Sequence, residues 1–281
     1  MQKKIYNLKK KSNQIRNQIL KMIVSAGKGH IGGALSCTDI IVTLFYGGIL
    51  RYDPLRPDWS ERDRFILSKG HSCTALYSVL ADLGYFQKSE LSKYGTNGCM
   101  LGGHPDRGIP GVEADTGSLG HGLGIAAGLA LSAKIDKNDF ITVVLLGDGE
   151  NCEGSVWEAA MFAARHGLRN VVAIVDNNGQ CATDLLENCI KHPLKDKWKS
   201  FGWDVTVLNG HSFEELLAAF NVIHSRKSER PLAVIANTVK GKGISYMEGK
   251  IDWHHRVPKG QEVEIARREL KWNLQNEGKS N

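Results

Sequence analysis

Two groups of polar residues stand directly after two short β-branched runs of the sequence. Gly147-Asp148-Gly149 follows residues 141–146, and Asn177-Asn178 follows residues 171–176. One carboxylate, one side-chain amide oxygen and a nearby backbone carbonyl form an incomplete set of oxygen ligands. Mg²⁺ accepts such a set and completes it with phosphate oxygens and water. Because the glycines beside Asp148 let the backbone approach a ligand closely, the pattern predicts a site for a metal-bound diphosphate.

The alternative interpretation of these dipeptides is two ordinary turns. Asp-Gly and Asn-Gly most often join a strand to the next element. Here Asp148 and Asn178 lie thirty residues apart, each after a β-branched run, which favours one shared site. A helix is expected to begin after Gly149, and its free amide groups would favour an anion there.

Three histidines lie in loops that contain glycine. His30 follows Lys28-Gly29, His71 follows Lys69-Gly70, and His104 follows Gly102-Gly103. A single histidine is most often structural or simply exposed. Imidazole can nevertheless donate to phosphate and hydroxyl oxygens and can move protons near neutral pH. Three histidines in such loops therefore predict imidazoles that face a ligand.

The elements that must position these residues alternate between two periodicities. Strand-like runs occupy residues 64–67, 141–146, 171–176, 204–208 and 232–237, and helical spacing occupies residues 72–83, 123–134, 155–166 and 213–225. This alternation predicts an α/β fold with a mostly parallel sheet flanked by helices, in a single domain over residues 1–281. Ligands of such sheets bind beyond the carboxyl ends of the strands, where Asp148 and Asn178 would both lie.

The composition is that of a globular protein. Of the 281 residues, 42% are hydrophobic and 23% charged, which excludes a disordered or collagen-like chain. No apolar run approaches the roughly 18 residues of a membrane span, and the basic N-terminus does not read as a secretory signal. Six cysteines occur without a C-x-x-C pair, so reduced thiols are expected. We therefore expect a cytoplasmic protein without a membrane partner.

The net charge of +6 (36 basic minus 30 acidic residues) is weak evidence for nucleic acid binding. Seven basic residues, Arg16 among them, lie within the first 21 positions, interleaved with apolar residues at helical spacing. This pattern predicts an amphipathic helix with a solvated basic face, and no nucleic acid partner is expected.

The segment from Gly147-Asp148-Gly149 to Asn177-Asn178 resembles the thiamine diphosphate motif. The chain from Gly29-His30-Ile31-Gly32-Gly33 to Trp253-His254 resembles the N-terminal, diphosphate-binding region of transketolases. The resemblance implies that Asp148, Asn178 and the carbonyl of Gln180 hold Mg²⁺, or another divalent ion such as Ca²⁺ or Mn²⁺. It also implies that Gly149 contacts the diphosphate of the cofactor.

The same resemblance implies roles for four histidines. His71 matches a residue that contacts the cofactor diphosphate, and His30 and His104 match residues that face the hydroxyl and carbonyl groups of the donor sugar. His254 matches a histidine near both the diphosphate and the substrate. We expect His30, His104 and His254 to take part in catalysis.

The stretch from Gly117 to Ala127 contains a G-x-G-x-x-A pattern, which taken alone suggests a dinucleotide-binding fold. That fingerprint requires a strand directly before it, and none is expected there. By the resemblance, Gly117 and Leu119 instead line the two rings of thiamine. The sequence departs from many relatives at His121, in place of glutamine, and at Ile31, in place of proline. Neither change removes a cofactor ligand, but Ile31 stands beside His30 and is expected to alter the shape of the substrate site.

The resemblance implies a transferase that moves a two-carbon ketol unit between sugar phosphates. The glutamate that activates the cofactor lies in a following pyrimidine-binding domain in this family, whereas the sequence ends at Asn281. We therefore expect a separate partner subunit with that domain. Glu153 and Glu158 match carboxylates that connect two active sites across a dimer, and Glu153 is expected to serve catalysis. The expected assembly is a heterotetramer in which two copies of this chain pair.

Two alternatives remain open at this stage. The chain could belong to a specialised transketolase that acts on a branched or modified sugar phosphate. It could also be a non-catalytic, cofactor-binding assembly subunit.

Overall fold

Five strands form one sheet in the computed structural model, which describes residues 1–190 and 193–276. Their order is β1-β2-β3-β5-β4, and every neighbouring pair is parallel. The strands are β1 (Arg64–Leu67), β2 (Thr142–Gly147), β3 (Val171–Asn177), β4 (Asp204–Asn209) and β5 (Leu232–Asn237). The predicted α/β fold class is confirmed, and each predicted strand lies within one residue of the observed bounds.

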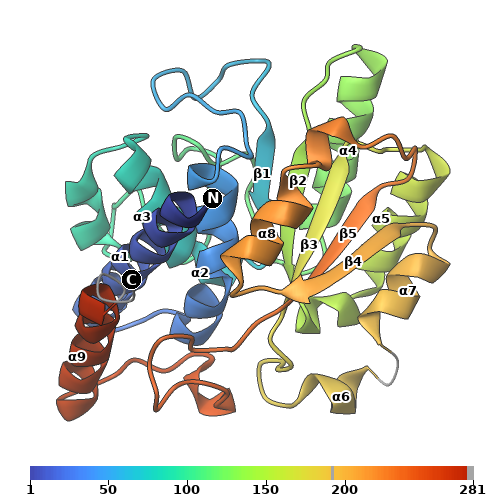
Figure 1. Cartoon of the computed structure of the whole chain (residues 1–281). Coiled ribbons are helices and arrows are strands. Elements are labelled where there is room, and N and C mark those ends of the chain that lie inside the picture. The colour runs from blue at the N-terminus through green and yellow to red at the C-terminus, as the bar shows by residue number, and fades with distance from the viewer. Residues whose placement is uncertain (191–192, 277–281) are drawn as a thin grey trace.

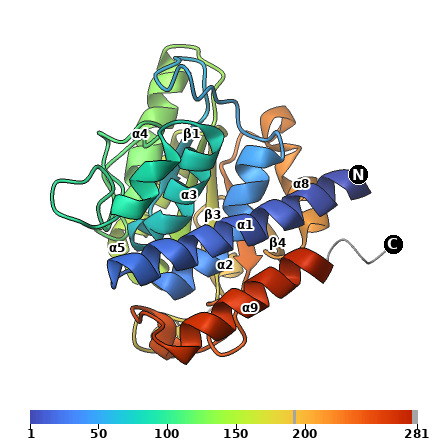
Figure 2. The ribbon, with the colours of Figure 1, turned by 90° about the vertical axis from the view of Figure 1, so that its left-hand side faces the viewer.

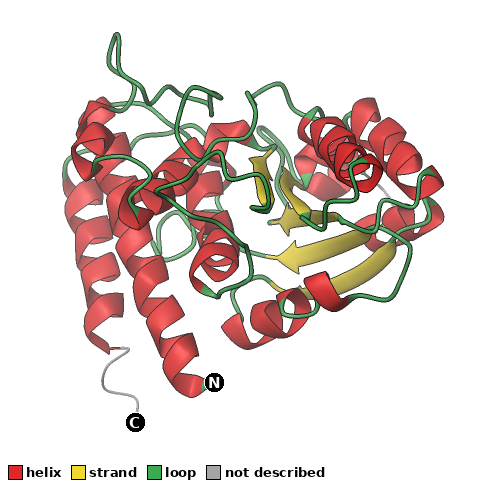
Figure 3. Ribbon diagram, turned by 90° about the horizontal axis from the view of Figure 1, so that it is seen from above, coloured by secondary structure: helices red, strands yellow, loops and turns green. Residues whose placement is uncertain are grey.

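Each face of the sheet has its own hydrophobic core because successive strand residues point to opposite sides. Val143 and Leu145 of β2 pack into one core, and Val144 and Leu146 pack into the other. The first face is covered by α1 (Gln2–Ala26), α2 (Ile31–Tyr46), α3 (Cys73–Leu83) and α8 (Phe213–Phe220). The second face is covered by α4 (Gly122–Ile135), α5 (Gly154–Arg165) and α7 (Leu194–Ser200). Figure 1 shows these two layers, and Figure 3 shows helices on both sides of the strands.

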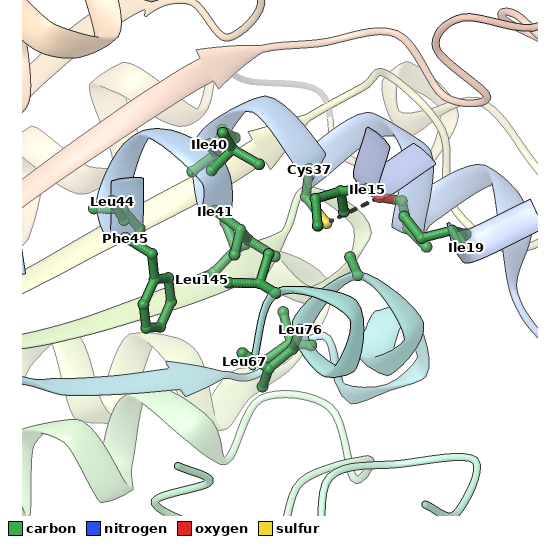
Figure 4. Packing of buried hydrophobic residues seen from close by; sticks show 14 of the residues in the cluster. Ile15, Ile19, Cys37, Ile40, Ile41, Leu44, Phe45, Leu67, Leu76 and Leu145 are labelled. Atoms are coloured by element: carbon green, nitrogen blue, oxygen red, sulfur yellow. Dashed lines mark hydrogen bonds between the residues drawn. The ribbon is translucent and has the colours of Figure 1, made fainter. Parts of the chain in front are cut away.

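The first core is the larger of the two. Ile41 of α2 lies close to Leu145 of the sheet and to Leu76 of α3 in Figure 4, and Ile40 belongs to the same hydrophobic core. All four side chains are at most 1% exposed. Burial of this kind fixes the position of α2, and the N-cap of α2 is His30.

The N-terminal helix α1 is amphipathic, as predicted, but one of its basic residues does not face solvent. Arg16 is buried, and its Nη2 donates to Asp39 of α2 at 2.7 Å. The expectation of a fully solvated basic face is therefore wrong at this position, because a buried carboxylate compensates the guanidinium. The C-terminal helix α9 (Gln261–Asn276) lies against α1, as Figure 2 shows.

Short helical segments complete the description. The predicted helix over residues 213–225 ends at Phe220 and is followed by a separate 3₁₀ turn. The short segments are η1 (Gly70–Ser72), η2 (Lys88–Lys93), η3 (Gly149–Cys152), α6 (Leu186–Cys189), η4 (Ile223–Ser225) and η5 (Ile251–Trp253). Over residues 1–190 and 193–276, no helix is both long and apolar enough to cross a membrane.

Candidate active site

A cavity of about 470 Å³ lies at the carboxyl edge of the sheet, where the parallel strands deliver their following loops. Ten residues that the sequence singled out line it: His30, His71, His104, Gly117, Leu119, Asp148, Gly149, Asn178, Gln180 and His254. They come from the ends of β1, β2 and β3, from the N-terminus of α2 and from loops before α4 and after β5. The structure thus brings together residues that are up to 224 positions apart (254 − 30).

Asp148 joins the loops after β2 and β3. Its Oδ1 accepts from the amide of Gly149 at 2.8 Å, and its Oδ2 accepts from the amide of Gly179 at 2.6 Å. Asn178 lies one residue before Gly179, and its Oδ1 accepts from the amide of Gln180 at 3.2 Å. The carboxylate and the amide oxygen therefore belong to one bonded unit of the cavity wall.

One expectation about this segment is wrong. The residues after Gly149 form the short segment η3, and α5 begins only at Gly154. The amide of Gly149 is already bonded to Asp148, so it is not a free donor at a helix N-terminus. Asp148 is the N-cap of η3, so its side chain occupies the amide of Gly149 at the start of a short 3₁₀ segment.

Buried charges lie beneath this unit. Lys69, which follows β1, pairs with Asp176 of β3, and its Nζ also donates to the carbonyl of Gly33 at 3.1 Å. Burial alone would lower the pKa of Lys69, but Asp176 outweighs this effect and raises it. Burial, together with the charge of Asp176, raises the pKa of Asp148 to about 6. A cation beside Asp148 would restore its ionised form.

Lys240 contributes a second buried amine to the cavity. Its Nζ donates to the carbonyl of Cys181 at 2.8 Å. Burial and the nearby charge of Lys69 lower the pKa of Lys240 to about 8. An anion bound between these amines would favour their charged forms.

Four imidazoles gather in one part of the cavity wall. The ring of His30 lies 5.2 Å from that of His71, 5.3 Å from that of His254 and 6.4 Å from that of His104, measured between centroids. Burial and neighbouring cations lower the pKa of His30 to about 4 and that of His254 to about 3. The pKa of His71 is also lowered, mainly by burial. Neutral rings can both donate and accept hydrogen bonds, as a polyhydroxylated substrate requires.

Gly117 allows close packing at this wall. Its φ of 140° lies in a region that L side chains rarely adopt, and a Cβ at this position would lie 2.8 Å from the ring of His104. The hydroxyl of Tyr77 donates to the carbonyl of His104 at 2.7 Å and holds that loop against α3. A larger residue at position 117 would displace His104 from the cavity.

The donor set fits a diphosphate bound through a divalent ion. The side-chain oxygen Oε1 of Gln180 and the nitrogen Nδ1 of His254 are buried without a hydrogen-bond partner and border the cavity. Such orphaned groups indicate a missing polar ligand. Within the described residues, no three His, Cys, Asp or Glu side chains are arranged to hold a metal alone. One carboxylate with amide and carbonyl oxygens instead suits an ion that phosphate oxygens complete.

Glu153 is the one predicted site residue that does not line the cavity. It is exposed at the N-cap of α5, and its stem packs against Gly120. Glu158 is also exposed, on the outer side of α5.

Sequence reasoning missed several residues of this site. Lys69 stands two positions before His71, and its buried partner Asp176 closes a β-branched run. Lys240 lines the cavity, and the ring of His255 lies 4.4 Å from that of His30. A charged residue inside a β-branched run is the only sequence signal for the Lys69–Asp176 pair.

Another missed residue is Glu150, which is buried and fixes the local backbone. Its carboxylate accepts from the amide of Gly120 at 2.8 Å and from that of Gly147 at 2.9 Å, and it also bonds the hydroxyl of Ser68. This carboxylate ties together the loops after β1 and β2 and the approach to α4. Its role in the fold therefore explains why it is buried.

Known proteins resemble the chain in sequence and in structure. The family description "Transketolase, thiamine diphosphate binding domain" matches residues 8–278. The chain belongs to this family. An apulose-4-phosphate transketolase subunit from Phocaeicola vulgatus is 40% identical over 278 residues, which cover 99% of this chain and 98% of that protein. The 6-deoxy-6-sulfo-D-fructose transketolase subunit SqwG of a Clostridium species is 39% identical over 251 residues, which cover 89% and 90%.

Transketolase from Campylobacter jejuni has the same fold, with a TM-score of 0.89 and 29% sequence identity. The match covers 96% of this chain and 45% of that one, so the chain spans less than half the length of this solved transketolase. The predicted family and the thiamine diphosphate-binding fold are confirmed.

Proposed function

We propose that this chain is the cofactor-binding subunit of a two-chain transketolase, in which it holds thiamine diphosphate through Mg²⁺. The observation that carries the proposal is the shared cavity of Asp148, Asn178 and the four histidines. Thiamine diphosphate, when bound, supplies the electron sink for ketol transfer. The chain's own residues bind and orient the cofactor, present hydrogen-bonding groups to the sugar and hold protons.

The electrostatics support a ligand that carries both signs of charge. The raised pKa of Asp148 favours an added cation, and the lowered pKa values of Lys240, His30 and His254 favour an added anion. A magnesium diphosphate provides both charges in one ligand. We assign Asp148, Asn178 and the carbonyl of Gln180 to the metal, with Ca²⁺ or Mn²⁺ as possible substitutes.

The organic part of the cofactor would pack against Gly117 and Leu119, and Gly149 and His71 would contact its diphosphate. The positive φ of Gly117 supports this assignment, because a side chain there would occupy the cavity wall.

The remaining histidines are assigned to the donor sugar. His30 and His104 would bond its hydroxyl and carbonyl oxygens, and His254 would bridge substrate and diphosphate. Because the pKa values of His30 and His254 are low, these rings are neutral at pH 7 and can accept a substrate proton. Polyhydroxylated sugar phosphates therefore suit this wall better than a short keto acid.

The proposed partner is a chain with the pyrimidine-binding domain. The names of the two relatives above contain the word subunit, which supports a multi-chain enzyme. Helices α4 and α5 pack together and expose apolar side chains at Ile125, Met161 and Phe162, which are 36%, 52% and 40% exposed. We propose that two copies pair across this face within a heterotetramer.

In that arrangement the exposed Glu153 and Glu158 would connect the paired sites, since both lie on or beside α5. We also propose a cytoplasmic location, supported by six cysteines that form no disulfide in the structure.

The decisive experiment is a calorimetric titration with thiamine diphosphate and Mg²⁺, with and without the companion chain, followed by an assay of ketol transfer. We expect binding that requires the divalent ion, and transfer only when both chains are present. Full transfer by this chain alone would contradict the two-chain proposal. Tight cofactor binding by the complex without any transfer would instead favour the non-catalytic assembly subunit.

A second candidate is a transketolase specialised for a branched or modified sugar phosphate. Two observations favour it: the names of the relatives specify apulose-4-phosphate and 6-deoxy-6-sulfo-D-fructose, and His255 adds a fifth ring beside His30. A panel of ordinary and modified sugar phosphates would separate the two candidates by the ratio of their kcat/KM values.

A further inference from the structure

Three cysteines from separate segments meet at the wall of the cofactor cavity. Cys152 ends η3, Cys181 lies in the loop after β3, and Cys189 ends α6, and all three line the cavity. Helix α6 packs against η3, so the segments that carry Cys189 and Cys152 are neighbours. The Cys181 thiol interacts with the thiols of both neighbours.

Cys181 also touches the proposed cofactor machinery directly. Its Sγ lies 3.0 Å from the position that a Cβ on Gly149 would take, and its carbonyl accepts from Lys240 at 2.8 Å. The residue before it is Gln180, whose carbonyl we assign to the metal. A change in the position of Cys181 would therefore move a proposed metal ligand and a proposed diphosphate contact together.

The local backbone favours one of the three possible pairings of these cysteines. Gln180 pairs with Leu185 in an antiparallel bridge, and the amide of Leu186 donates to the carbonyl of Gly179 at 2.9 Å. This closed hairpin leads directly into α6, so Cys181 and Cys189 are held on the same small unit. Cys189 and Cys152 are both exposed, whereas Cys181 is partly buried, so a small-molecule reagent reaches the outer thiols before Cys181. Of these two, only Cys189 follows directly from the hairpin that carries Cys181.

We propose that Cys181 and Cys189 form a reversible disulfide, and that the oxidised chain binds the metal and thiamine diphosphate more weakly. The oxidant is a low-molecular-weight disulfide such as oxidised glutathione. Cys189, as thiolate, attacks it and releases one small thiol. Cys181 then loses its proton, attacks the sulfur of Cys189 in the mixed disulfide and releases the second small thiol. Two cysteine thiols and one small disulfide thus become one protein disulfide and two small thiols.

The weaker binding follows from geometry and rests on the function proposed above. Bonded sulfur atoms lie ~2.05 Å apart, so two thiols in contact must move toward one another to form the bond. Both the backbone and the side chain of Cys181 lie against Gly149, so we expect the bond to shift this segment together with the adjacent Gln180. Mg²⁺ requires near-ideal octahedral geometry, so a displaced ligand lowers its affinity. A metal site is not an alternative use of these thiols, since the described residues contain no group of three such side chains that could hold an ion.

The bond itself is tested by equilibration in reduced and oxidised glutathione, followed by peptide mapping. Cys181 and Cys189 lie in one tryptic peptide, residues 170–191, and a cut after Glu187 separates them. We expect this peptide to lose two hydrogens and its fragments to stay linked until a reductant is added. The bond should persist in Cys152→Ser and in the control Cys99→Ser, and disappear in Cys189→Ser. A Cys152–Cys181 bond, or no bond in fully oxidising buffer, would overturn the proposal.

The consequence is tested on the same samples, with the companion chain present for the cofactor titration. Oxidation should speed hydrogen exchange of the Gly179 amide, which donates to Asp148. It should also weaken the Mg²⁺-dependent affinity for thiamine diphosphate at least tenfold. Oxidation should change neither quantity in Cys189→Ser. Unchanged exchange and affinity in the mapped disulfide form would refute the coupling. If the reduced complex binds no cofactor, the proposed function fails. Peptide mapping and amide exchange would still show whether the Cys181–Cys189 bond forms and whether it alters the segment around Gly179.

Discussion

At the carboxyl edge of the sheet, burial suppresses the charges of the cavity, whereas at the amino edge hydrogen-bond partners favour the charged forms of Asp63 and His224. In the cavity, the pKa values of His30 and His254 fall to about 4 and about 3, and that of Asp148 rises to about 6. Each of these shifts disfavours an ionised group. The cavity is electrostatically incomplete without a ligand.

The amino edge is complete by itself. Asp63, which precedes β1, accepts from the amide of Ile141 at 3.0 Å, from Arg51 and from His224 at 3.2 Å. Burial alone would raise the pKa of Asp63, but the bonds from His224, Arg51 and Ile141 outweigh it and lower the pKa. Asp63 also raises the pKa of His224. The comparison thus distinguishes the cavity, whose ionisable groups become favourable only when a ligand binds, from the Asp63 cluster, whose groups already stabilise the fold.

The strongest test of this contrast replaces the carboxylate of the cavity. We expect Asp148→Ala to weaken Mg²⁺-dependent binding of thiamine diphosphate more than about 100-fold, because a direct ligand should matter more than groups that only orient a ligand, whose loss costs about 10–100-fold. Its unfolding free energy should fall by no more than about 1–2 kcal/mol, because release of the unfavourable buried charge offsets part of the two lost hydrogen bonds from Gly149 and Gly179. Calorimetric titration and urea unfolding measure the two effects.

Asp58→Ala is the matched control, because Asp58 is exposed and lies near the amino edge. Affinity retained in Asp148→Ala would remove Asp148 from the metal site.

The converse substitution is Asp63→Ala. It strips partners from Arg51, His224 and the buried amide of Ile141, so we expect the unfolding free energy to fall by ~3 kcal/mol. The cofactor affinity of the folded protein should stay within about twofold. Asp139→Ala is the control, since Asp139 also bonds Arg51 but its side chain is 83% exposed, and surface pairs contribute at most ~1 kcal/mol. If Asp63→Ala and Asp139→Ala lowered the unfolding free energy equally, burial of Asp63 would not explain its contribution to stability.

Within the cavity, the residue proposed to bind the sugar, His104, can be tested apart from those proposed to bind the metal. His104→Ala should lower kcat/KM for the donor sugar about 100-fold, as expected for a lost proton-handling or carbonyl-binding group, with cofactor affinity changed no more than about threefold. His166→Ala, an exposed histidine at the end of α5, is the control. A loss confined to cofactor affinity would move His104 to the diphosphate site.

The same contrast explains what the sequence could reveal. The fold was predictable because strands buried on both faces read as β-branched runs, and because Gly147–Gly149 and Asn177-Asn178 stand at their ends. The cavity residues were predictable where glycine neighbours marked them, as for His30 and His104.

Other features depend on three-dimensional proximity alone. The Lys69–Asp176 pair joins residues 107 positions apart, and nothing in either local sequence announces the other. Arg16 was misplaced for the same reason, since its burial depends on Asp39 of the neighbouring helix. The expectation of free amide groups at Gly149 was wrong, because Asp148 caps the short 3₁₀ segment that begins there and α5 begins only at Gly154.

The smallest expected effect compares one histidine from each region. Because the folded pKa of His224 is raised, its stabilising contribution is fully present below the unfolded value of about 6.5 and is lost as pH rises through the folded pKa. The folded pKa of His30 is lowered to about 4, so protons favour the unfolded state between about pH 6.5 and 4. The wild type should therefore lose its advantage over His224→Gln as pH rises, and should lose stability relative to His30→Gln as pH falls.

Urea unfolding of the three proteins from pH 4.5 to 8.5 measures both slopes, and the difference from each variant cancels all other titrating groups that do not contact the replaced ring. Slopes of the same sign would show that the two edges treat charge alike. Opposite slopes would show that the fold favours the protonated form of His224 and the neutral form of His30, which lies in the cavity.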